Sequence, residues 1–147
     1  MQAVNLGVLL FIPYRHMENR ILQAVKDAGY DDVTLAQARV FQRIAPEGSR
    51  LTDLAEQSQM TKQSVAGLVD ELERMRYVKR VPEPNDRRAR LIQIDKRGRQ
   101  AAKAAQVAHD KVQAEWRSRL GARRYTQLRE TLEDLREITD PFAATSE

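Results

Sequence analysis

The segment LTDLAEQSQMTKQSVAGLVDELERMRYV, residues 51–78, constrains the fold of this chain more than any other stretch. Apolar residues recur at helical spacing on both sides of Gln59, where the pattern breaks and indicates a tight turn. Thr52 is the predicted cap of a short first helix, and Thr61 is the predicted cap of a longer second helix. A short helix, a tight turn and a second helix together predict a helix-turn-helix.

Two short β-type runs follow the second helix, VKRVP at 78–82 and ARLIQI at 89–94. The linking sequence EPNDRR contains Pro84 and Asn85, which favour a turn. The two runs therefore predict a β-hairpin directly after the helix-turn-helix, which is the arrangement of a winged helix.

Three arginines crowd the predicted hairpin tip, Arg87, Arg88 and Arg90. Their mutual repulsion needs compensation, either from a local acid or from a polyanion outside the protein. Asp86 is expected to orient the loop through an ion pair with Arg88, but an exposed ion pair contributes only about 0–1 kcal/mol. Arg87 is expected to project furthest, and an arginine there could enter the DNA minor groove, where negative potential is concentrated. The plainer alternative is a solvated hairpin tip.

Positive charge is concentrated in the middle third of the chain. Residues 62–99 contain 11 basic and 6 acidic residues, whereas the remainder contains 14 basic and 15 acidic residues. Such an asymmetry is the electrostatic footprint expected for a nucleic-acid partner. A solvated basic surface would give the same distribution, so charge alone leaves both interpretations open.

The second helix of the predicted helix-turn-helix opens with the polar residues Lys62, Gln63 and Ser64. A helix fits the DNA major groove, and its N-terminal residues reach the base edges first. Gly67 costs about 1 kcal/mol in a helix relative to alanine, which indicates either close approach to DNA or packing against a neighbour. The residues expected to contact double-stranded DNA are Thr52, Thr61, Lys62, Gln63, Ser64, Gly67, Lys79, Arg87, Arg88 and Arg90.

Helical periodicity also predicts helices before and after this segment. The six predicted helices span about 4–28, 31–44, 53–58, 61–76, 96–120 and 123–138. Pro13 is expected to kink or restart the first helix, and Thr34 and Asp95 are expected to cap the second and fifth. The predicted fold class is therefore mainly α, with a two-stranded β wing.

This combination resembles the DNA-binding core of MarR-family transcriptional regulators. The matching features are the L-x-x-L-A opening at 51–55, the V-x-x-L-V-x-x-L helix at 65–72, the V-x-R strand at 78–80, the D-R-R-A wing at 86–89 and the G-R pair at 98–99. The flanking helices extend the resemblance over nearly the whole chain. Two departures are Tyr77, where many members have glycine, and Ile94-Asp95, where many have Leu-Thr.

The resemblance implies a sequence-specific, ligand-responsive repressor that binds a pseudo-palindromic operator as a homodimer. It implies one domain over 1–147, with a winged helix-turn-helix lobe at 34–95, dimerisation helices at 4–30 and 96–140, and a frayed tail at 141–147. The terminal helices carry more apolar surface than one small lobe would cover, although an intramolecular helical hairpin is an alternative. The residues expected to form the dimer are Leu9, Leu10, Trp116, Leu128, Leu132 and Leu135.

The resemblance also implies where an effector would bind. Members of this family often release DNA when a small aromatic or anionic molecule enters a cleft between the dimerisation helices and the winged-helix lobe. The candidate effector-binding residues are Tyr14, Arg15, His16 and Arg39. An arginine could pair with a carboxylate and a tyrosine could stack on a ring, but ordinary surface or interface roles are the alternative.

The sequence gives no reason to expect catalysis, a cofactor or a metal. It has no cysteine and only two histidines, and it lacks G-x-S-x-G, H-E-x-x-H and a phosphate-cradling glycine loop. Its longest apolar run, residues 6–12, is far shorter than the roughly 20 residues of a membrane span, so we expect a cytoplasmic protein without membrane contact.

A second non-enzymatic function is a winged-helix protein-interaction module whose basic wing binds an acidic partner. A protein-docking surface should present large apolar or aromatic groups. The polar opening at Lys62, Gln63 and Ser64 does not fit that requirement and favours DNA.

Overall fold

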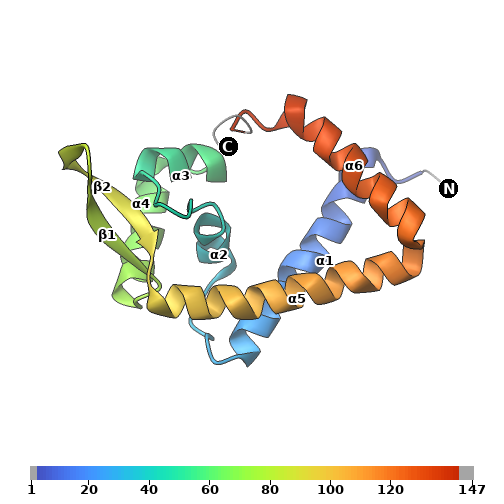
Figure 1. Cartoon of the computed structure of the whole chain (residues 1–147), viewed down its shortest axis with the longest axis horizontal. Coiled ribbons are helices and arrows are strands. Elements are labelled where there is room, and N and C mark those ends of the chain that lie inside the picture. The colour runs from blue at the N-terminus through green and yellow to red at the C-terminus, as the bar shows by residue number, and fades with distance from the viewer. Residues whose placement is uncertain (1–2, 143–147) are drawn as a thin grey trace. The chain divides into compact units, whose positions relative to one another are not determined.

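The computed structural model describes residues 3–142 (Figure 1). The elements are α1 Leu6–Asp27, α2 Leu35–Phe41, α3 Leu51–Ser58, α4 Lys62–Arg74, β1 Val78–Glu83, β2 Asp86–Ile94, α5 Lys96–Leu120 and α6 Ala122–Thr139. The strands pair antiparallel in a two-stranded sheet, so the mainly α fold class with a β wing is confirmed. Most of the frayed tail predicted for 141–147 lies outside the described residues.

The chain divides within α5 into two compact units, Met1–Ala108 and His109–Glu147. The first unit contains α1 to β2 and the beginning of α5, and the second contains the remainder of α5 and α6. In the first unit α2, α3 and α4 contact one another, and β1 lies against α4. The helix-turn-helix and its wing therefore form parts of one packed body.

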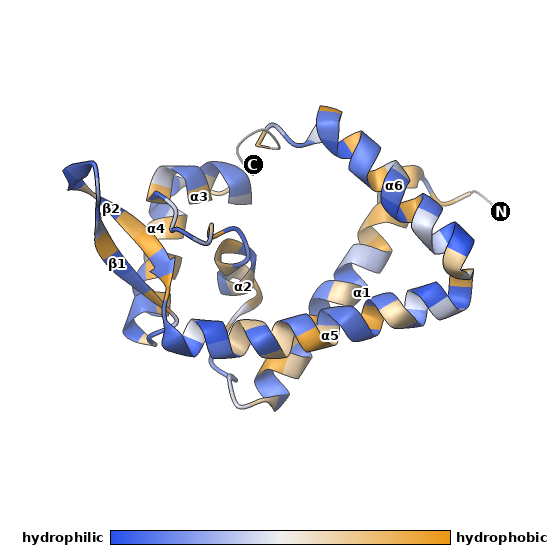
Figure 2. Cartoon of the chain, in the orientation of Figure 1, coloured by the Kyte–Doolittle hydropathy of each residue, from blue (hydrophilic) through white to orange (hydrophobic). Residues whose placement is uncertain are grey.

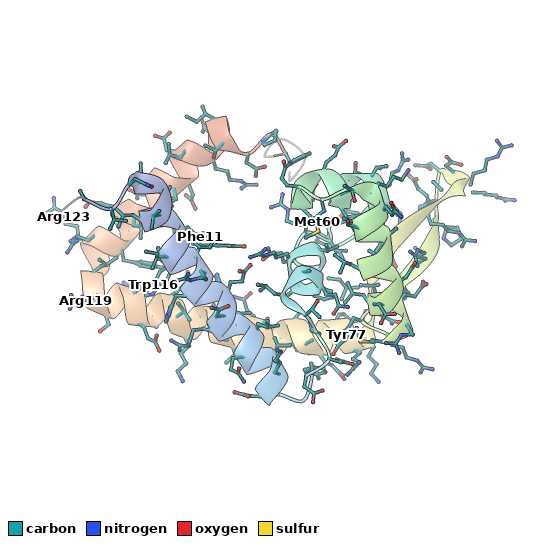
Figure 3. All side chains as sticks on the ribbon, turned by 180° about the vertical axis from the view of Figure 1, so that it is seen from behind. Phe11, Met60, Tyr77, Trp116, Arg119 and Arg123 are labelled. Atoms are coloured by element: carbon teal, nitrogen blue, oxygen red, sulfur yellow. The ribbon has the colours of Figure 1, made fainter. Side chains whose placement is uncertain are left out.

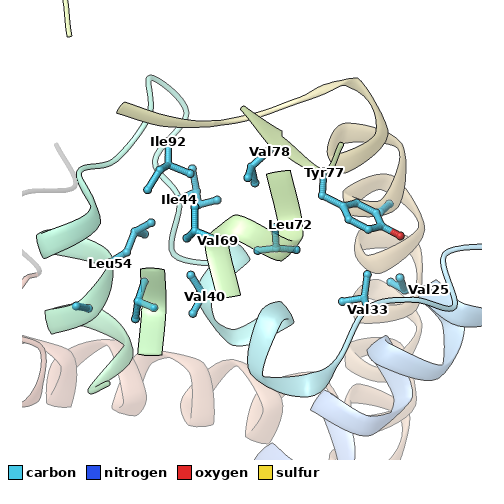
Figure 4. Close-up of a cluster of buried hydrophobic side chains, with 13 residues drawn as sticks. Val25, Val33, Val40, Ile44, Leu54, Val69, Leu72, Tyr77, Val78 and Ile92 are labelled. Carbon is cyan, nitrogen blue, oxygen red and sulfur yellow. The ribbon is translucent and has the colours of Figure 1, made fainter. Parts of the chain in front are cut away.

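A cluster of mostly aliphatic side chains holds this body together (Figure 4). The fully buried members are Val40, Leu54, Val65, Val69, Leu72, Tyr77, Val78 and Ile92. They come from α2, α3, α4, β1 and β2 and, for Tyr77, from the short segment between α4 and β1. Burying one such side chain contributes about 1.5–3 kcal/mol. This shared core fixes α4 relative to the wing.

Two of the predicted helix caps are confirmed in full. Thr34 forms a capping box with Gln37, in which each side chain accepts a hydrogen bond from the other residue's backbone amide. Thr61 Oγ1 accepts a hydrogen bond from the Ser64 amide at 3.1 Å. At the start of α5, Asp95 Oδ1 accepts a hydrogen bond from the Lys96 amide at 2.7 Å.

The prediction that Thr52 caps the third helix is wrong. This helix begins at Leu51, its N-cap residue is Arg50, and Thr52 lies inside the first turn. The cause is a β-bridge just before the helix, where the Ser49 amide donates to the Ile92 carbonyl at 3.0 Å and the Ile92 amide donates back at 2.8 Å. This bridge holds the chain extended at Arg50, so the helix starts earlier than the sequence indicates.

Helix α1 continues through Pro13 without restarting. It begins at Leu6, where the Asn5 side chain accepts a hydrogen bond from the Val8 amide at 3.0 Å. A proline inside a helix removes one backbone donor, and α1 tolerates that loss. None of the helices within residues 3–142 combines the length and apolarity needed to cross a membrane.

The chain leaves α4 through one residue in the left-handed conformation. The left-handed conformation that favours glycine occurs at Arg76, with a φ of 65°, one residue before Tyr77. Tyr77 is instead a fully buried core residue that leads into β1. The backbone conformation that glycine would relieve therefore lies at Arg76, and Tyr77 does not require a glycine.

Candidate nucleic-acid interface

The recognition helix α4 presents its first turn to solvent. Lys62, Gln63 and Ser64 are all exposed, as the sequence predicts. The Thr61 hydroxyl is occupied within the fold, because it caps the Ser64 amide and donates to Ser64 Oγ at 2.8 Å. Among the described residues, Lys62 and Gln63 make no side-chain hydrogen bond or ion pair, so both remain available to a ligand.

Gly67 lies on the exposed surface of α4, one turn after Gln63. A Cβ atom built at Gly67 meets no described atom within 4 Å. The alternative that this glycine packs against a neighbour is therefore wrong. Because Gly67 has no side chain, another molecule could approach the backbone of α4 closely at this position.

Replacing Gly67 with alanine should have opposite effects on folding and on DNA binding. The free energy of unfolding should rise by about 1 kcal/mol, because alanine is the better helix former and has open space here. Affinity for duplex DNA should fall if the backbone approaches the groove at this point. Thermal melting and fluorescence anisotropy measure the two effects, and a stabilised variant with unchanged affinity would remove Gly67 from the interface.

The wing carries its arginines on β2 and not on the turn. Only Pro84 and Asn85 separate the strands, and Arg87, Arg88 and Arg90 are exposed along β2. Asp86 Oδ1 accepts a hydrogen bond from the Arg88 backbone amide at 3.0 Å. The predicted ion pair between these two side chains is wrong, because a short acid at a turn satisfies the nearby backbone instead. In the described part of the chain, none of the three guanidinium groups has an acidic partner.

Arg80 makes contacts to α4 that the sequence does not predict. Its guanidinium donates to Asp70 Oδ1 and to Glu73 Oε1, both at 2.7 Å. The Arg80 amide also donates to Glu73 Oε2 at 3.2 Å, so side chain and backbone both tie β1 to α4. These pairs neutralise two acids on the recognition helix that would otherwise repel phosphate. The only signal of this role in the sequence is the position of Arg80 in the V-x-R strand that follows α4.

A second ion pair ties the tip of the wing to α3. Arg50 Nη2 lies 2.7 Å from Glu83 Oε1, and the Glu83 side chain is mostly buried. Arg50 therefore compensates the acid that precedes the turn, and Glu83 is not free to compensate the β2 arginines. Lys79, also predicted to contact DNA, is exposed on β1 opposite Gln93.

Two of the four candidate effector residues lie together around an acid that the sequence reasoning missed. Glu18 accepts hydrogen bonds from Arg39 at 2.8 and 2.9 Å and from the Tyr14 hydroxyl at 3.0 Å. The Arg39 guanidinium, and to a lesser extent the Tyr14 hydroxyl, hold the pKa of Glu18 below its ordinary value despite partial burial. Arg15 and His16 are exposed, and Arg15 lies over the Phe11 ring at 5.5 Å.

Apolar side chains remain exposed on the terminal helices of the single chain. On α1, Leu9 and Leu10 are 53% and 48% exposed, and Figure 2 shows hydrophobic colouring along the first turns of this helix. On α6, none of the residues is buried, and Leu128, Leu132 and Leu135 are 39–44% exposed. Within the described residues, the leucine stripe of α6 therefore stays partly exposed in the single chain.

Trp116 lies on α5 in the second unit and is half-buried (Figure 3). In the same unit the Tyr125 hydroxyl donates to Gln113 Oε1 at 2.7 Å, which joins α6 to α5. Within residues 3–142, the histidine and acidic side chains form no group of three that could hold a metal ion.

Residues 31–89 match the model of the MarR family. Among curated proteins, none matches this chain. The matched range covers the two helices and most of the wing that form the surface described above.

Several solved structures share the fold over nearly their whole length. CouR from Rhodococcus jostii, bound to p-coumaroyl-CoA, is 25% identical, covers 96% of this chain and 97% of its own, and has a TM-score of 0.72. Apo MarR from E. coli is 20% identical over 91% of this chain and 98% of its own, with a TM-score of 0.71. A mutant of S. aureus MepR bound to an oligodeoxyribonucleotide is 20% identical over 90% and 96%, with a TM-score of 0.59.

Proposed function

We propose that this chain is a winged-helix transcriptional regulator of the MarR family and not an enzyme. In this proposal it is a ligand-responsive repressor that binds a pseudo-palindromic DNA operator as a homodimer. One observation carries the proposal. The exposed polar start of α4 and the three unpaired arginines of β2 belong to one packed body, while Arg80 and Arg50 neutralise the neighbouring acids. Such a surface offers hydrogen bonds to base edges and positive charge to phosphates.

The DNA contacts in this proposal divide into two kinds. Gln63 and Lys62 are the candidates for base reading in the major groove. The candidates for phosphate and minor-groove contacts are Arg87, Arg88, Arg90, Lys79, Thr52, Ser64 and the backbone at Gly67. Thr61 contributes by capping α4, because its hydroxyl is already occupied by Ser64.

The homodimer in this proposal is supported by the exposed apolar residues of α1 and α6. A second copy of the chain would cover Leu9, Leu10, Leu128, Leu132 and Leu135, with Trp116 at the edge of the contact. Two-fold symmetry would place the recognition helices about 34–36 Å apart, one turn of the duplex. The organisation as one domain, with dimerisation helices at 4–30 and 96–140 around the lobe at 34–95, belongs to this proposal.

The charge distribution along α6 gives further support for a partner helix. Its first half, residues 122–129, contains three arginines and no acid, whereas residues 130–139 contain four acids and one arginine. This order opposes the helix dipole, which favours acids at the start and bases at the end by about 0.3–1 kcal/mol each. A second copy of α6 running antiparallel would set bases against acids and compensate both ends.

The effector in this proposal is a small aromatic or anionic molecule that binds near Tyr14, Arg15, His16 and Arg39. The molecule bound to CouR, p-coumaroyl-CoA, combines both properties, which makes that class of molecule a reasonable first test. Arg39 already holds Glu18 through two hydrogen bonds. An anionic effector would therefore have to displace Glu18, and a neutral aromatic one would bind beside the pair.

Replacing Arg87 with alanine should weaken binding to all duplex sequences alike. Each phosphate contact contributes about one unit to the slope of log affinity against log salt concentration, so the slope should fall by about one. Fluorescence anisotropy over a series of salt concentrations measures this slope.

Gln63→Ala is the matched comparison for Arg87→Ala. It should leave the salt slope unchanged and cost about 1–3 kcal/mol on the best sequence only, because a base contact is lost. A wild-type chain with no salt-dependent affinity for any duplex would contradict the proposed function. An unchanged slope for Arg87→Ala alone would remove only Arg87 from the contacts.

A further inference from the structure

Tyr77 lies where four parts of the first unit meet. Its amide donates to the Leu72 carbonyl of α4 at 2.9 Å, and its carbonyl accepts from the Asp95 amide at 2.9 Å, just before α5. The residue therefore joins the end of the recognition helix, both ends of the wing and the start of α5. Figure 4 shows the Tyr77 ring near Val33 and Val25, at the opposite end of the core from Ile92 and Leu54.

The side chain of Tyr77 extends this junction to the segment between α1 and α2. Its hydroxyl donates to the carboxylate of Asp32, which follows Tyr30 in that segment. The Tyr30 and Tyr77 rings meet edge to face, with centroids 6.3 Å apart. A buried hydroxyl without such an acceptor would be costly, so the acid and the phenol require each other.

Arg97, in the first turn of α5, binds three features of the junction at once. It donates to both oxygens of Asp32, at 2.9 and 3.3 Å, and to the Met75 carbonyl at 2.9 Å. Its guanidinium carbon also lies 4.3 Å from the centroid of the Tyr77 ring. Met75 is the C-cap of α4, where a cation stabilises the exposed carbonyls of the helix end.

This arrangement fixes the orientation of α4 and also stabilises the fold. Packing of a Tyr77 ring alone would tolerate small rotations of α4, because dispersion contacts have little angular preference. Hydrogen bonds to Asp32 and to the Met75 carbonyl restrict those rotations, since they weaken steeply away from linear geometry. The pKa of Tyr77 is raised by burial and then by Asp32, so the hydroxyl stays protonated and donating at neutral pH.

We infer that Asp32, Tyr77 and Arg97 are positioning residues for operator recognition, which hold the recognition helix and the wing at the angle that base reading requires. The inference rests on the proposed DNA-binding function. None of the three needs to touch DNA. Base contacts demand placement within about 0.5 Å, whereas phosphate contacts tolerate more movement, so the network should affect specific binding more than non-specific binding.

Tyr77→Phe tests the inference, because it removes the hydroxyl and keeps the ring. In the full chain, affinity for the operator should fall about tenfold, while affinity for a random duplex at the same salt concentration stays within about twofold. The readout is the dissociation constant for the random duplex divided by that for the operator. Both constants are measured by fluorescence anisotropy on folded protein, and this ratio should fall. A merely structural role would lower the melting temperature and leave this ratio unchanged.

Asp32→Asn provides a second variant if Tyr77→Phe folds poorly, because the Asp32 side chain is 37% exposed and asparagine fits the same space. Asp32→Asn should also lower this ratio. The double variant should lower it by less than the product of the two single effects, because both changes disrupt one network. Unchanged ratios in Asp32→Asn, or multiplicative effects in the double variant, would overturn the inference alone. A wild-type chain that binds operator and random duplex equally would overturn the proposed function as well.

Discussion

Gly98→Ala is expected to lower the free energy of unfolding by about 3 kcal/mol, the upper end of the range for overpacking a core. A Cβ atom at Gly98 would lie 2.2 Å from the Tyr77 carbonyl oxygen and 3.0 Å from side-chain atoms of Ile94 and Phe41. The first of these is a backbone atom that already accepts the Asp95 amide, so it cannot move away freely. The first turn of α5 would be pushed off the junction. Chemical denaturation followed by circular dichroism measures the loss.

Gly67→Ala is the matched control for this change. Both glycines lie within helices, and both variants gain the same helix propensity of about 1 kcal/mol. Of the two, Gly98 has described neighbours within 4 Å of the added atom and Gly67 has none. Equal stabilities for the two variants would mean that α5 does not approach Tyr77 as closely as the geometry indicates.

Leu132→Glu is expected to convert the proposed dimer into a monomer and to weaken operator binding by about 100-fold. Leu132 lies in the middle of the exposed α6 stripe, so a dimer would have to bury the new carboxylate without a partner. Losing the dimer removes the second half-site contact, and linked contacts of this kind contribute about 10²–10⁴ in affinity. Sedimentation equilibrium and fluorescence anisotropy measure the two effects.

Thr126→Glu introduces the same charge outside the leucine stripe of α6, near its first turn, where an acid is favourable. It should leave both the molecular mass in solution and operator affinity close to those of the wild-type chain. If Leu132→Glu stayed as self-associated as Thr126→Glu, the α6 stripe would not be the dimer contact.

The sequence predicts the elements of this fold because their signals are local. The apolar spacing around Gln59, the cap at Thr61 and the Pro84-Asn85 turn each depend on residues a few positions apart. The one wrong cap, at Thr52, arose from a long-range cause, the bridge between Ser49 and Ile92. Helix periodicity contains no information about such a bridge.

The same distinction explains which residues the sequence does not identify. Lys62, Gln63 and the β2 arginines were predicted because their type and place in an element are sufficient evidence. Arg80, Glu18 and Arg97 act through partners that are 10, 21 and 65 positions away in the chain. Only the folded structure brings these partners together, so single-sequence reasoning could assign them charge but not a role.

Selection of bound fragments from random duplex DNA tests the central claim most directly. A two-fold pair of winged helices should recover an inverted repeat whose half-sites lie about 10–10.5 base pairs apart, centre to centre. Recovery of a single unrepeated site would contradict the dimer, and enrichment of no sequence at all would contradict sequence-specific recognition by α4.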